Sequence, residues 1–218
     1  MIVCDKEKEL LIKSDDVMNI KVRKRWCRAE ARKTLKSLKD GYRSEASGRI
    51  CHTVYHMPEY KKAKTIMAYM SMDKEVMTVS LLVTMLRHGK RICLPRCTQA
   101  EYREDGTIAE SVLEAREFSS DYKLIISNYG IPEPGTDATL VNPEDIDMVI
   151  LPCVSCDRHC RRIGHGKGYY DSYIKKLRPD CVKVALCYEE LLADEIPYEN
   201  HDELMDAVIS EEKLYKRI

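Results

Sequence analysis

The sequence has no long hydrophobic run. No stretch of about 18 consecutive apolar residues occurs along the chain, so no transmembrane helix is predicted and no membrane partner is expected. The start, Met-Ile-Val-Cys-Asp-Lys-Glu-Lys, also lacks the order of a signal peptide, in which basic residues precede an apolar segment. Both absences favour a cytoplasmic protein.

The chain also has no net charge, because 36 Lys and Arg residues balance 36 Asp and Glu residues. The balance is uneven, since residues 21–43 hold ten basic and two acidic side chains. A run of this kind is usually the solvated face of a helix, and the alternative is an arm that binds nucleic acid. We predict a helix here and no nucleic-acid partner.

Cysteines at the spacing of a small disulfide-bonded scaffold are missing, although the chain has ten cysteines. In a reducing cytosol they are expected to be thiols, several of them buried. One cluster, Cys153, Cys156, His159 and Cys160, places four potential zinc ligands within eight residues. No second ligand pair follows at finger-like spacing. We interpret the cluster as core thiols beside a loop and keep zinc binding as the alternative.

Helical and strand patterns alternate along the chain. Helices are predicted at residues 19–39, 44–55, 79–87 and 169–177, and strands at residues 65–70, 91–94, 146–151, 182–187 and 207–209. Gly41, Pro95 and Pro152 are expected to end the elements before them. Residues 131–135, Ile-Pro-Glu-Pro-Gly, are expected to form a rigid loop.

This alternation predicts an α/β fold with three layers: a mixed, mostly parallel sheet with helices on both faces. Residues 96–120 are expected to be irregular, with a strand pair around a turn at Asp105 and Gly106. No internal repeat or low-complexity linker divides the chain. Residues 1–20 are therefore predicted to be an N-terminal extension, and residues 21–218 a single domain.

Three of the nine glycines alternate in one short segment, Arg162–Asp171, at Gly164, Gly166 and Gly168. Glycine allows positive φ and a close approach of the backbone to a ligand. Exposed N–H groups in such a loop, followed by a helix, form an anion cradle. Lys167 and Arg162 add positive charge that suits a polyphosphate, and Asp171 is placed to hold Mg²⁺. The segment predicts a nucleotide site.

The glycine segment differs from the two common nucleotide motifs. It is no ordinary P-loop, because Lys167 is followed by Gly168 and not by Ser or Thr. It is no dinucleotide fingerprint either, because the glycines have Gly-x-Gly-x-Gly spacing with a cation inside. The alternative to a ligand site is a tight turn before a surface helix.

Polar residues follow three of the predicted strands or end them, at Ser71–Glu75, Leu94–Arg96 and Leu151–Pro152 with the segment beyond. Ligands of open α/β sheets bind beyond the carboxyl ends of the strands. This arrangement predicts one shared cleft. As alternatives, Asp73 and Glu75 would be acids before a helix N-terminus, and His201–Asp202 an ordinary turn.

Taken together, residues 21–211 resemble the 5-formyltetrahydrofolate cyclo-ligase family, also called methenyltetrahydrofolate synthetases. The resemblance centres on Arg162-Ile-Gly-His-Gly-Lys-Gly-Tyr-Tyr-Asp171, the counterpart of the family signature Arg-Leu-Gly-x-Gly-x-Gly-Tyr-Tyr-Asp. Four further segments support it: Ser71–Glu75 with Thr78, Gly130–Pro134, Asp147–Pro152 and Asn200–Asp202.

The resemblance implies an ATP- and Mg²⁺-dependent closure of 5-formyltetrahydrofolate to 5,10-methenyltetrahydrofolate through a phosphorylated formyl group. It implies catalytic roles for Lys167, Arg162 and Tyr169, and Mg²⁺ ligands in Asp171 and Asp202. The implied ATP site comprises Lys24, Arg25, Arg28, Arg162, Gly164, His165, Gly166, Lys167, Gly168, Tyr169 and Tyr170. The implied folate site comprises Met70, Glu75, His165, Gly166, Lys167, Gly168 and Tyr169.

The sequence departs from the family pattern at a few positions. His165 fills a variable position, and Cys153 and Cys156 stand where Gly and Phe are common, which is expected to loosen a wall of the folate pocket. Two other functions stay open. One is a non-catalytic metal- or nucleic-acid-binding protein that uses the cysteine cluster and the basic helix. The other is an enzyme that phosphorylates a different carbonyl or carboxylate. We expect a monomer.

Overall fold

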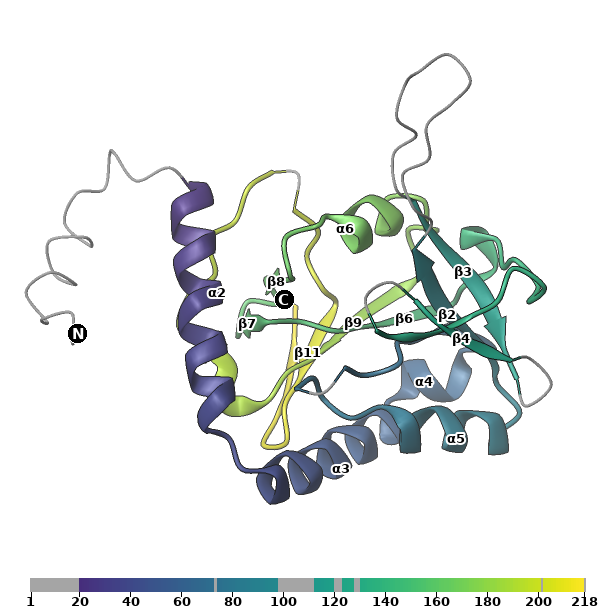
Figure 1. Cartoon of the computed structure of the whole chain (residues 1–218), viewed down its shortest axis with the longest axis horizontal. Coiled ribbons are helices and arrows are strands. Elements are labelled where there is room, and N and C mark those ends of the chain that lie inside the picture. Colours follow the sequence, from purple (N-terminus) through teal and green to yellow (C-terminus); the bar gives the residue numbers. More distant parts are fainter. Residues whose placement is uncertain are drawn as a thin grey trace, which may run out of the picture.

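The computed structural model describes residues 20–72, 74–97, 112–119, 123–127, 130–200 and 202–217. A seven-stranded sheet, in the order β12-β11-β9-β6-β1-β2-β3, runs through its centre (Figure 1). In that order the strands are Leu214–Lys216, Ala207–Ile209, Val182–Leu186, Met148–Leu151, Thr65–Met67, Arg91–Cys97 and Leu113–Phe118.

The five inner strands are parallel to one another, and the two edge strands, β12 and β3, are antiparallel to their neighbours. The middle strand, β6, has the sequence Met-Val-Ile-Leu, and all four residues are buried. A continuous apolar run suits a parallel strand that is covered on both faces. The predicted mixed, mostly parallel sheet is confirmed.

Helices cover the sheet on both faces. In Figure 1, α3, α4 and α5 lie below the sheet and α6 lies above it. Their bounds are Asp40–His56, Pro58–Lys62, Val79–Arg87 and Tyr169–Ile174. In α5, Leu81, Leu82 and Met85 are buried, whereas Val79 and Val83 are exposed. This spacing of three to four residues gives the helix one buried face.

Helix α2, Ile20–Ser37, stands beside a small second sheet rather than over the large one (Figure 1). That sheet has the order β10-β7-β8, with strands Leu192–Ala193, Ser155–Asp157 and Arg162–Ile163. A two-stranded sheet of β4, Leu124–Ile126, and β5, Pro132–Pro134, and the 3₁₀ turns η1, Pro143–Asp145, and η2, Glu189–Leu191, complete the elements.

The β7–β8 hairpin separates β6 from the glycine loop, residues 164–168. The loop was expected to follow directly after Pro152, without a hairpin between them. The turn of the hairpin is fixed by Asp157, a fully buried carboxylate. The carboxylate accepts hydrogen bonds from the backbone N–H groups of His159 at 2.9 Å, Arg161 at 3.0 Å and Ile196 at 2.9 Å. These bonds satisfy a buried charge and hold the start of the loop in place.

Several predicted boundaries are wrong. Gly41 lies inside α3, because the break falls earlier, between Ser37 and Asp40. Pro95 continues β2, because the pairing with β1 has ended at Cys93 and only β3 still pairs there. Pro132–Pro134 forms a strand, β5, where a loop was expected.

The predicted turn at 105–106 and almost all of the predicted N-terminal extension lie outside the described residues. Of the predicted helices, α5 has the expected bounds, whereas α2, α3 and α6 differ at one or both ends.

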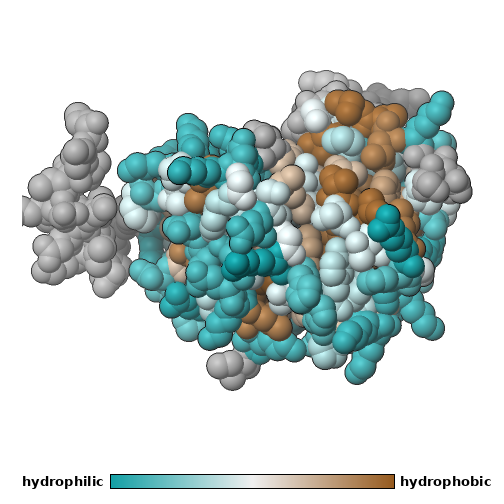
Figure 2. Space-filling model, turned by 90° about the horizontal axis from the view of Figure 1, so that it is seen from below, coloured by the Kyte–Doolittle hydropathy of each residue, from teal (hydrophilic) through white to brown (hydrophobic). Residues whose placement is uncertain are grey.

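No helix among the described residues is long and apolar enough to cross a membrane. Seen from below (Figure 2), the surface is largely hydrophilic, with hydrophobic residues gathered toward the right of the view.

Candidate active site

A pocket of about 400 Å³ opens where β1, β2 and β6 end. The three strand ends contribute Met70, Pro95 and Pro152 to its lining, so the predicted shared cleft is confirmed. All the predicted site residues line the pocket except Arg25, which is exposed on α2. Those that line it are Lys24, Arg28, Met70, Glu75, Arg162, Gly164, His165, Gly166, Lys167, Gly168, Tyr169, Tyr170, Asp171 and Asp202.

The glycine loop forms one rim of this pocket. Gly166 and Gly168 have φ angles of 97° and 73°, a conformation that only glycine adopts without strain. Gly168 is followed by α6, and its carbonyl accepts a hydrogen bond from Ser172 N at 3.0 Å. Residues 165–168 are exposed, so the backbone of the loop is open to a ligand.

The basic helix α2 contacts the glycine loop directly. Arg28 Nε donates a hydrogen bond to Gly164 O at 2.8 Å. A Cβ atom on Gly166 would lie 3.4 Å from Arg28 Cζ, so the loop and the guanidinium are already in close contact. Burial lowers the pKa of Arg28, with nearby Arg32 contributing in the same direction. The basic segment therefore belongs to the pocket wall.

Lys24, one helical turn before Arg28, joins the opposite end of the chain. Its Nζ lies 2.6 Å from Asp202 Oδ2 and 2.8 Å from Glu199 Oε2. Burial opposes the charge, but the hydrogen bonds to Asp202 and Glu199 prevail and raise the pKa of Lys24. A cation expected at phosphate and a carboxylate expected at Mg²⁺ thus pair with each other.

Arg162 makes the second pair of this kind. Its side chain is 3% exposed, and Nη2 lies 2.9 Å from Asp171 Oδ1. Nη1 donates to Pro152 O at 3.2 Å, whereas the buried Nε has no hydrogen-bond partner among the described residues. A buried donor without a partner costs about 1–3 kcal/mol. An anionic ligand in the pocket would supply the missing acceptor.

Lys167 differs from Lys24 and Arg162, which are both paired with carboxylates. It is exposed at the tip of the loop, and no carboxylate of the described residues pairs with it. An unpaired Lys ammonium on an open loop is available to an incoming anion. Unlike Lys24 and Arg162, which pair with carboxylates, Lys167 therefore needs no exchange of partner to bind phosphate.

Glu75 lines the pocket beside His165, and its side chain is 9% exposed. Its Oε2 accepts a hydrogen bond from Met72 N at 2.9 Å, and its Oε1 lies 3.4 Å from His165 Nε2. Thr78 braces the same loop, since its Oγ1 donates to Tyr69 O at 2.6 Å and accepts from Ser71 N at 3.1 Å. Glu75 is thus held on a fixed loop; Asp73 lies outside the described residues.

Glu133 is a pocket residue for which no role was predicted from the sequence. It lies in β5, is 5% exposed, and accepts a hydrogen bond from Cys97 N at 3.4 Å. Burial raises the pKa of its carboxyl. The segment Gly130–Pro134 contributed to the family resemblance, but the strand that turns Glu133 into the pocket is too short to be predicted from pattern.

Apolar and aromatic groups form the rest of the wall. Leu94, Leu113 and Tyr69 line the pocket and are nearly fully buried. The Tyr170 ring lies 5.8 Å from Arg162 Cζ, and burial raises the pKa of its hydroxyl, so the group stays protonated. Flat apolar walls with one charged end suit an aromatic ring system.

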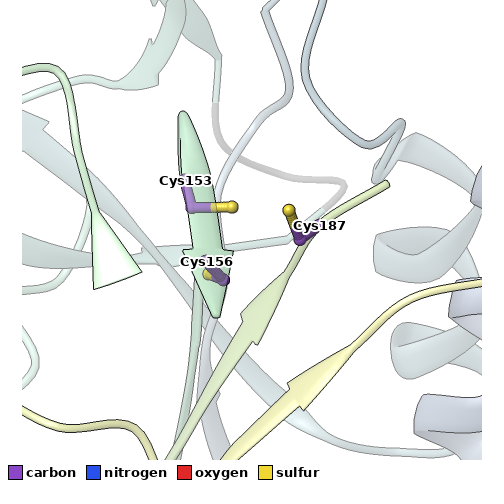
Figure 3. Close-up of side chains that lie close together, drawn as sticks. All are labelled: Cys153, Cys156 and Cys187. Carbon is purple, nitrogen blue, oxygen red and sulfur yellow. The ribbon is translucent and has the colours of Figure 1, made fainter. Parts of the chain in front are cut away.

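The four residues of the alternative zinc site, Cys153, Cys156, His159 and Cys160, do not come together, whereas Cys156 and Cys160 are buried thiols as predicted. Cys153 and Cys156 lie together, but with Cys187 as the third thiol (Figure 3). His159 is exposed, and Cys160 Sγ donates to Tyr215 O at 3.6 Å. Hydrogen bonds from the thiols of Cys156 and Cys187 lower the pKa of Cys153.

The cysteines at which the sequence departs from the family pattern lie outside the pocket lining. Neither Cys153 nor Cys156 is among the described residues that line it, and Cys156 is fully buried. The expected loosening of a folate wall, where Cys replaces a common Phe, stays a prediction. His165, the other departure, does line the pocket, beside Glu75.

The fold and the pocket define an α/β protein with a ligand site at the carboxyl ends of parallel strands, walled by a glycine loop and cationic side chains. The chain belongs to the 5-formyltetrahydrofolate cyclo-ligase family, whose profile matches residues 20–211. As a member of that family it is a ligase.

Relatives and solved structures agree with this assignment. The chain is 32% identical to the probable 5-formyltetrahydrofolate cyclo-ligase of Schizosaccharomyces pombe, over 90% of this chain and 99% of that one. It is 28% identical to the mouse 5-formyltetrahydrofolate cyclo-ligase, over 87% and 94%. The structure of Aquifex aeolicus 5,10-methenyltetrahydrofolate synthetase superposes with a TM-score of 0.75 at 25% identity, covering 88% of this chain and 92% of that one.

Proposed function

We propose that the protein closes 5-formyltetrahydrofolate to 5,10-methenyltetrahydrofolate, using ATP and Mg²⁺ and releasing ADP and phosphate. One observation carries the proposal. The glycine loop of the family signature lies in one pocket with the cations of α2, two carboxylates and the buried Glu75. A site for phosphate and a site for a flat, hydrogen-bonding ring system therefore share a single cavity.

The proposed chemistry begins at the formyl oxygen, which is a poor leaving group. That oxygen attacks the γ-phosphorus of ATP, a C–O–P linkage forms, and ADP leaves. N10 of the folate then attacks the activated formyl carbon and loses its proton. The C–O bond breaks, phosphate departs with its electron pair, and the methenyl bridge between N5 and N10 remains. Such a reaction depends mainly on positioning and on neutralising phosphate charge.

Arg162 and Lys167 are the groups proposed to neutralise that charge. Lys167 is unpaired among the described residues, and the Arg162 Nε lacks an acceptor. Phosphate oxygens would also replace Asp171 at Nη2 of Arg162. In the same way, Lys24 and Arg28 of α2 are proposed to hold the phosphates farther along ATP. Tyr169, at the start of α6, is proposed to wall the site beside the formyl group.

Asp171 and Asp202 fit the proposed role of Mg²⁺ ligands. Both carboxylates line the pocket, and hard cations prefer carboxylate oxygens. Each is paired with a cation, Arg162 or Lys24, that would turn to phosphate when ATP binds. When bound, Mg²⁺ supplies positive charge to phosphate oxygens.

Glu75 is proposed to recognise the pterin. A pterin offers N–H donors along one edge, and a carboxylate on a fixed loop accepts from two of them at once. The apolar residues around the carboxylate, including Met70 and Leu94, would contact the ring faces. Glu133 adds a second acid to the same cavity.

The test is a direct assay with 5-formyltetrahydrofolate, ATP and Mg²⁺, following the near-ultraviolet absorbance of the methenyl product. We expect turnover by the wild type and loss of about 100-fold or more in Lys167→Ala, because a charge that stabilises the transition state is removed. Lys175→Ala is the matched control, since that exposed lysine follows α6 outside the pocket. Absence of product from the wild type would contradict the proposed reaction, and equal rates in the two variants would contradict the role of Lys167.

A further inference from the structure

Three thiols gather beyond the ends of β6 and β9: Cys153 and Cys156, which are close in the sequence, and the distant Cys187. The Sγ atoms of Cys153, Cys156 and Cys187 all lie within 4.8 Å of one another. Figure 3 shows the side chains of Cys153 and Cys187 directed toward each other, with Cys156 beside them. Among the described residues, no other three His, Cys, Asp or Glu side chains bring their ligand atoms so close together.

The sheet register produces this cluster. Strands β6 and β9 are parallel neighbours, with Leu151 opposite Ala185. Cys153 and Cys187 each lie two residues farther along, so they come side by side where the strands end. Ser155 Oγ donates to Leu191 O at 2.6 Å, which turns Ser155 away and brings Cys156 to the same side as Cys153. The arrangement is therefore built into the fold.

The dimensions suit a metal ion. A Zn–S distance of about 2.3 Å in a tetrahedral site requires sulfur atoms about 3.8 Å apart. The observed separations need to shrink by about 1 Å at most, which small rotations of the side chains supply. Thiolate sulfur selects soft ions such as Zn²⁺ or Cu⁺ over Mg²⁺. The thiol cluster therefore suits a soft metal ion, whereas the proposed phosphate site suits the hard ion Mg²⁺.

Burial gives the cluster one open side. Cys156 and Cys187 are 0% and 1% exposed, whereas Cys153 is half-buried. Three protein ligands with one accessible position is the ligand count of an open zinc site. Three thiolates around Zn²⁺ leave a net charge of only minus one, which a nearby cation would offset. The buried guanidinium of Arg162 lies near the cluster, because it binds the carbonyl of Pro152, the residue before Cys153.

We propose that Cys153, Cys156 and Cys187 form a binding site for one thiophilic d¹⁰ metal ion, with Zn²⁺ as the first candidate. The site is separate from the proposed Mg²⁺ ligands Asp171 and Asp202. It also differs from the ligand set that sequence spacing indicated, because Cys187 replaces His159 and Cys160. Binding releases the thiol protons and changes no oxidation state.

Cobalt titration of the reduced, metal-free full-length chain tests the proposal. We expect a sulfur-to-cobalt charge-transfer band in the near ultraviolet and strong visible bands of tetrahedral Co²⁺, saturating at about one ion per chain, as three thiolates and one open position require. One equivalent of Zn²⁺ should then bleach these bands. Cys187→Ser should lose them, and Cys160→Ser, a buried thiol outside the cluster, should keep them.

A second measurement needs no variant and so does not depend on whether Cys187→Ser folds. Mass spectrometry after alkylation of the folded wild type should show that Zn²⁺ protects Cys153, the half-buried thiol of the cluster, whereas the half-buried Cys27 is modified with or without the metal. No cobalt bands in the reduced wild type, wild-type bands in Cys187→Ser, or equal alkylation of Cys153 with and without Zn²⁺ would overturn the proposal.

Discussion

At the scale of single residues, the position of Arg162 depends on the missing side chain of Gly164. A Cβ atom on Gly164 would lie 2.9 Å from Arg162 Nη1, closer than such contacts occur. The guanidinium cannot easily move aside, because it is buried and held by Asp171 and Pro152. This glycine is therefore needed for space, whereas Gly166 and Gly168 are needed for positive φ.

Gly164→Ala should therefore lower turnover by roughly 100-fold while the fold is kept, because a displacement of about 1 Å in a positioned group has an effect of that size. The assay is formation of the methenyl product, with circular dichroism to check the fold. Gly48→Ala is the matched control, since a Cβ there meets nothing within 4 Å. Gly48 is inside α3, so its replacement should leave activity unchanged and stabilise the helix by up to about 1 kcal/mol. Equal activity in the two variants would show that Arg162 does not act from its observed position.

Glu133 gives a prediction for pH. Burial raises the pKa of its carboxyl in the folded state above that in the unfolded state. Between those two pKa values the folded protein binds the extra proton, so its stability falls as pH rises through that window. Glu133→Gln removes the titration and keeps an acceptor for Cys97 N. The variant should melt at a higher temperature than the wild type at pH 7, and the difference should vanish below the ordinary Glu range.

Thermal unfolding at a series of pH values checks this prediction. Glu30→Gln is the control, because Glu30 is exposed on α2 and should give the same curve as the wild type at every pH. A wild type that is more stable than Glu133→Gln at pH 7 would mean that the ionised carboxylate stabilises the fold.

At the scale of elements, α2 presents only one face to the pocket. Lys24 and Arg28 are four residues apart and lie on the same side of the helix, whereas Arg25 is rotated away and exposed. A run of basic residues does not by itself show which cations face a ligand. For that reason Lys24, Arg25 and Arg28 were all predicted to bind ATP. The helix geometry separates them.

Arg28→Ala should raise the KM for ATP roughly 10- to 100-fold, since a charge-assisted hydrogen bond contributes about 1.5–3 kcal/mol. Arg25→Ala makes the same substitution on the exposed face of the same helix. It should change that KM by less than about twofold, as expected for an exposed charge. Steady-state kinetics with varied ATP at saturating folate measures both. A large effect of Arg25→Ala would mean that ATP reaches beyond the pocket rim.

Elements with strong periodicity or long apolar runs could be predicted from the sequence. Helix α5 and strand β6 are of this kind, because their burial patterns follow directly from residue order. The β7–β8 hairpin, β5 and β12 could not be predicted. Their strands have two or three residues, and contacts with distant segments, such as the hydrogen bond that Ile196 N donates to Asp157, hold them in place.

At the scale of the whole molecule, the pocket combines segments from opposite ends of the chain. Lys24 in the first described helix pairs with Glu199 and Asp202 near the last strands. The glycine loop could be predicted because its residues are consecutive. Glu133 and Cys187 could not, because only the strand register brings them to the pocket and to the thiol cluster.

This arrangement predicts that ligand binding stabilises the entire fold. A ligand that binds only the folded state at about 100 times its Kd adds about 2.7 kcal/mol to the free energy of unfolding. For a chain of this size that corresponds to a rise of roughly 5–10 °C in Tm. ATP with Mg²⁺ should therefore shift the melting of the wild type by that amount, and ATP without Mg²⁺ by less, because Asp171 and Asp202 would remain paired with Arg162 and Lys24. Differential scanning fluorimetry measures the shift, and Lys167→Ala should lose most of it while Lys175→Ala retains it. A shift that is the same in both variants would place the nucleotide away from the glycine loop.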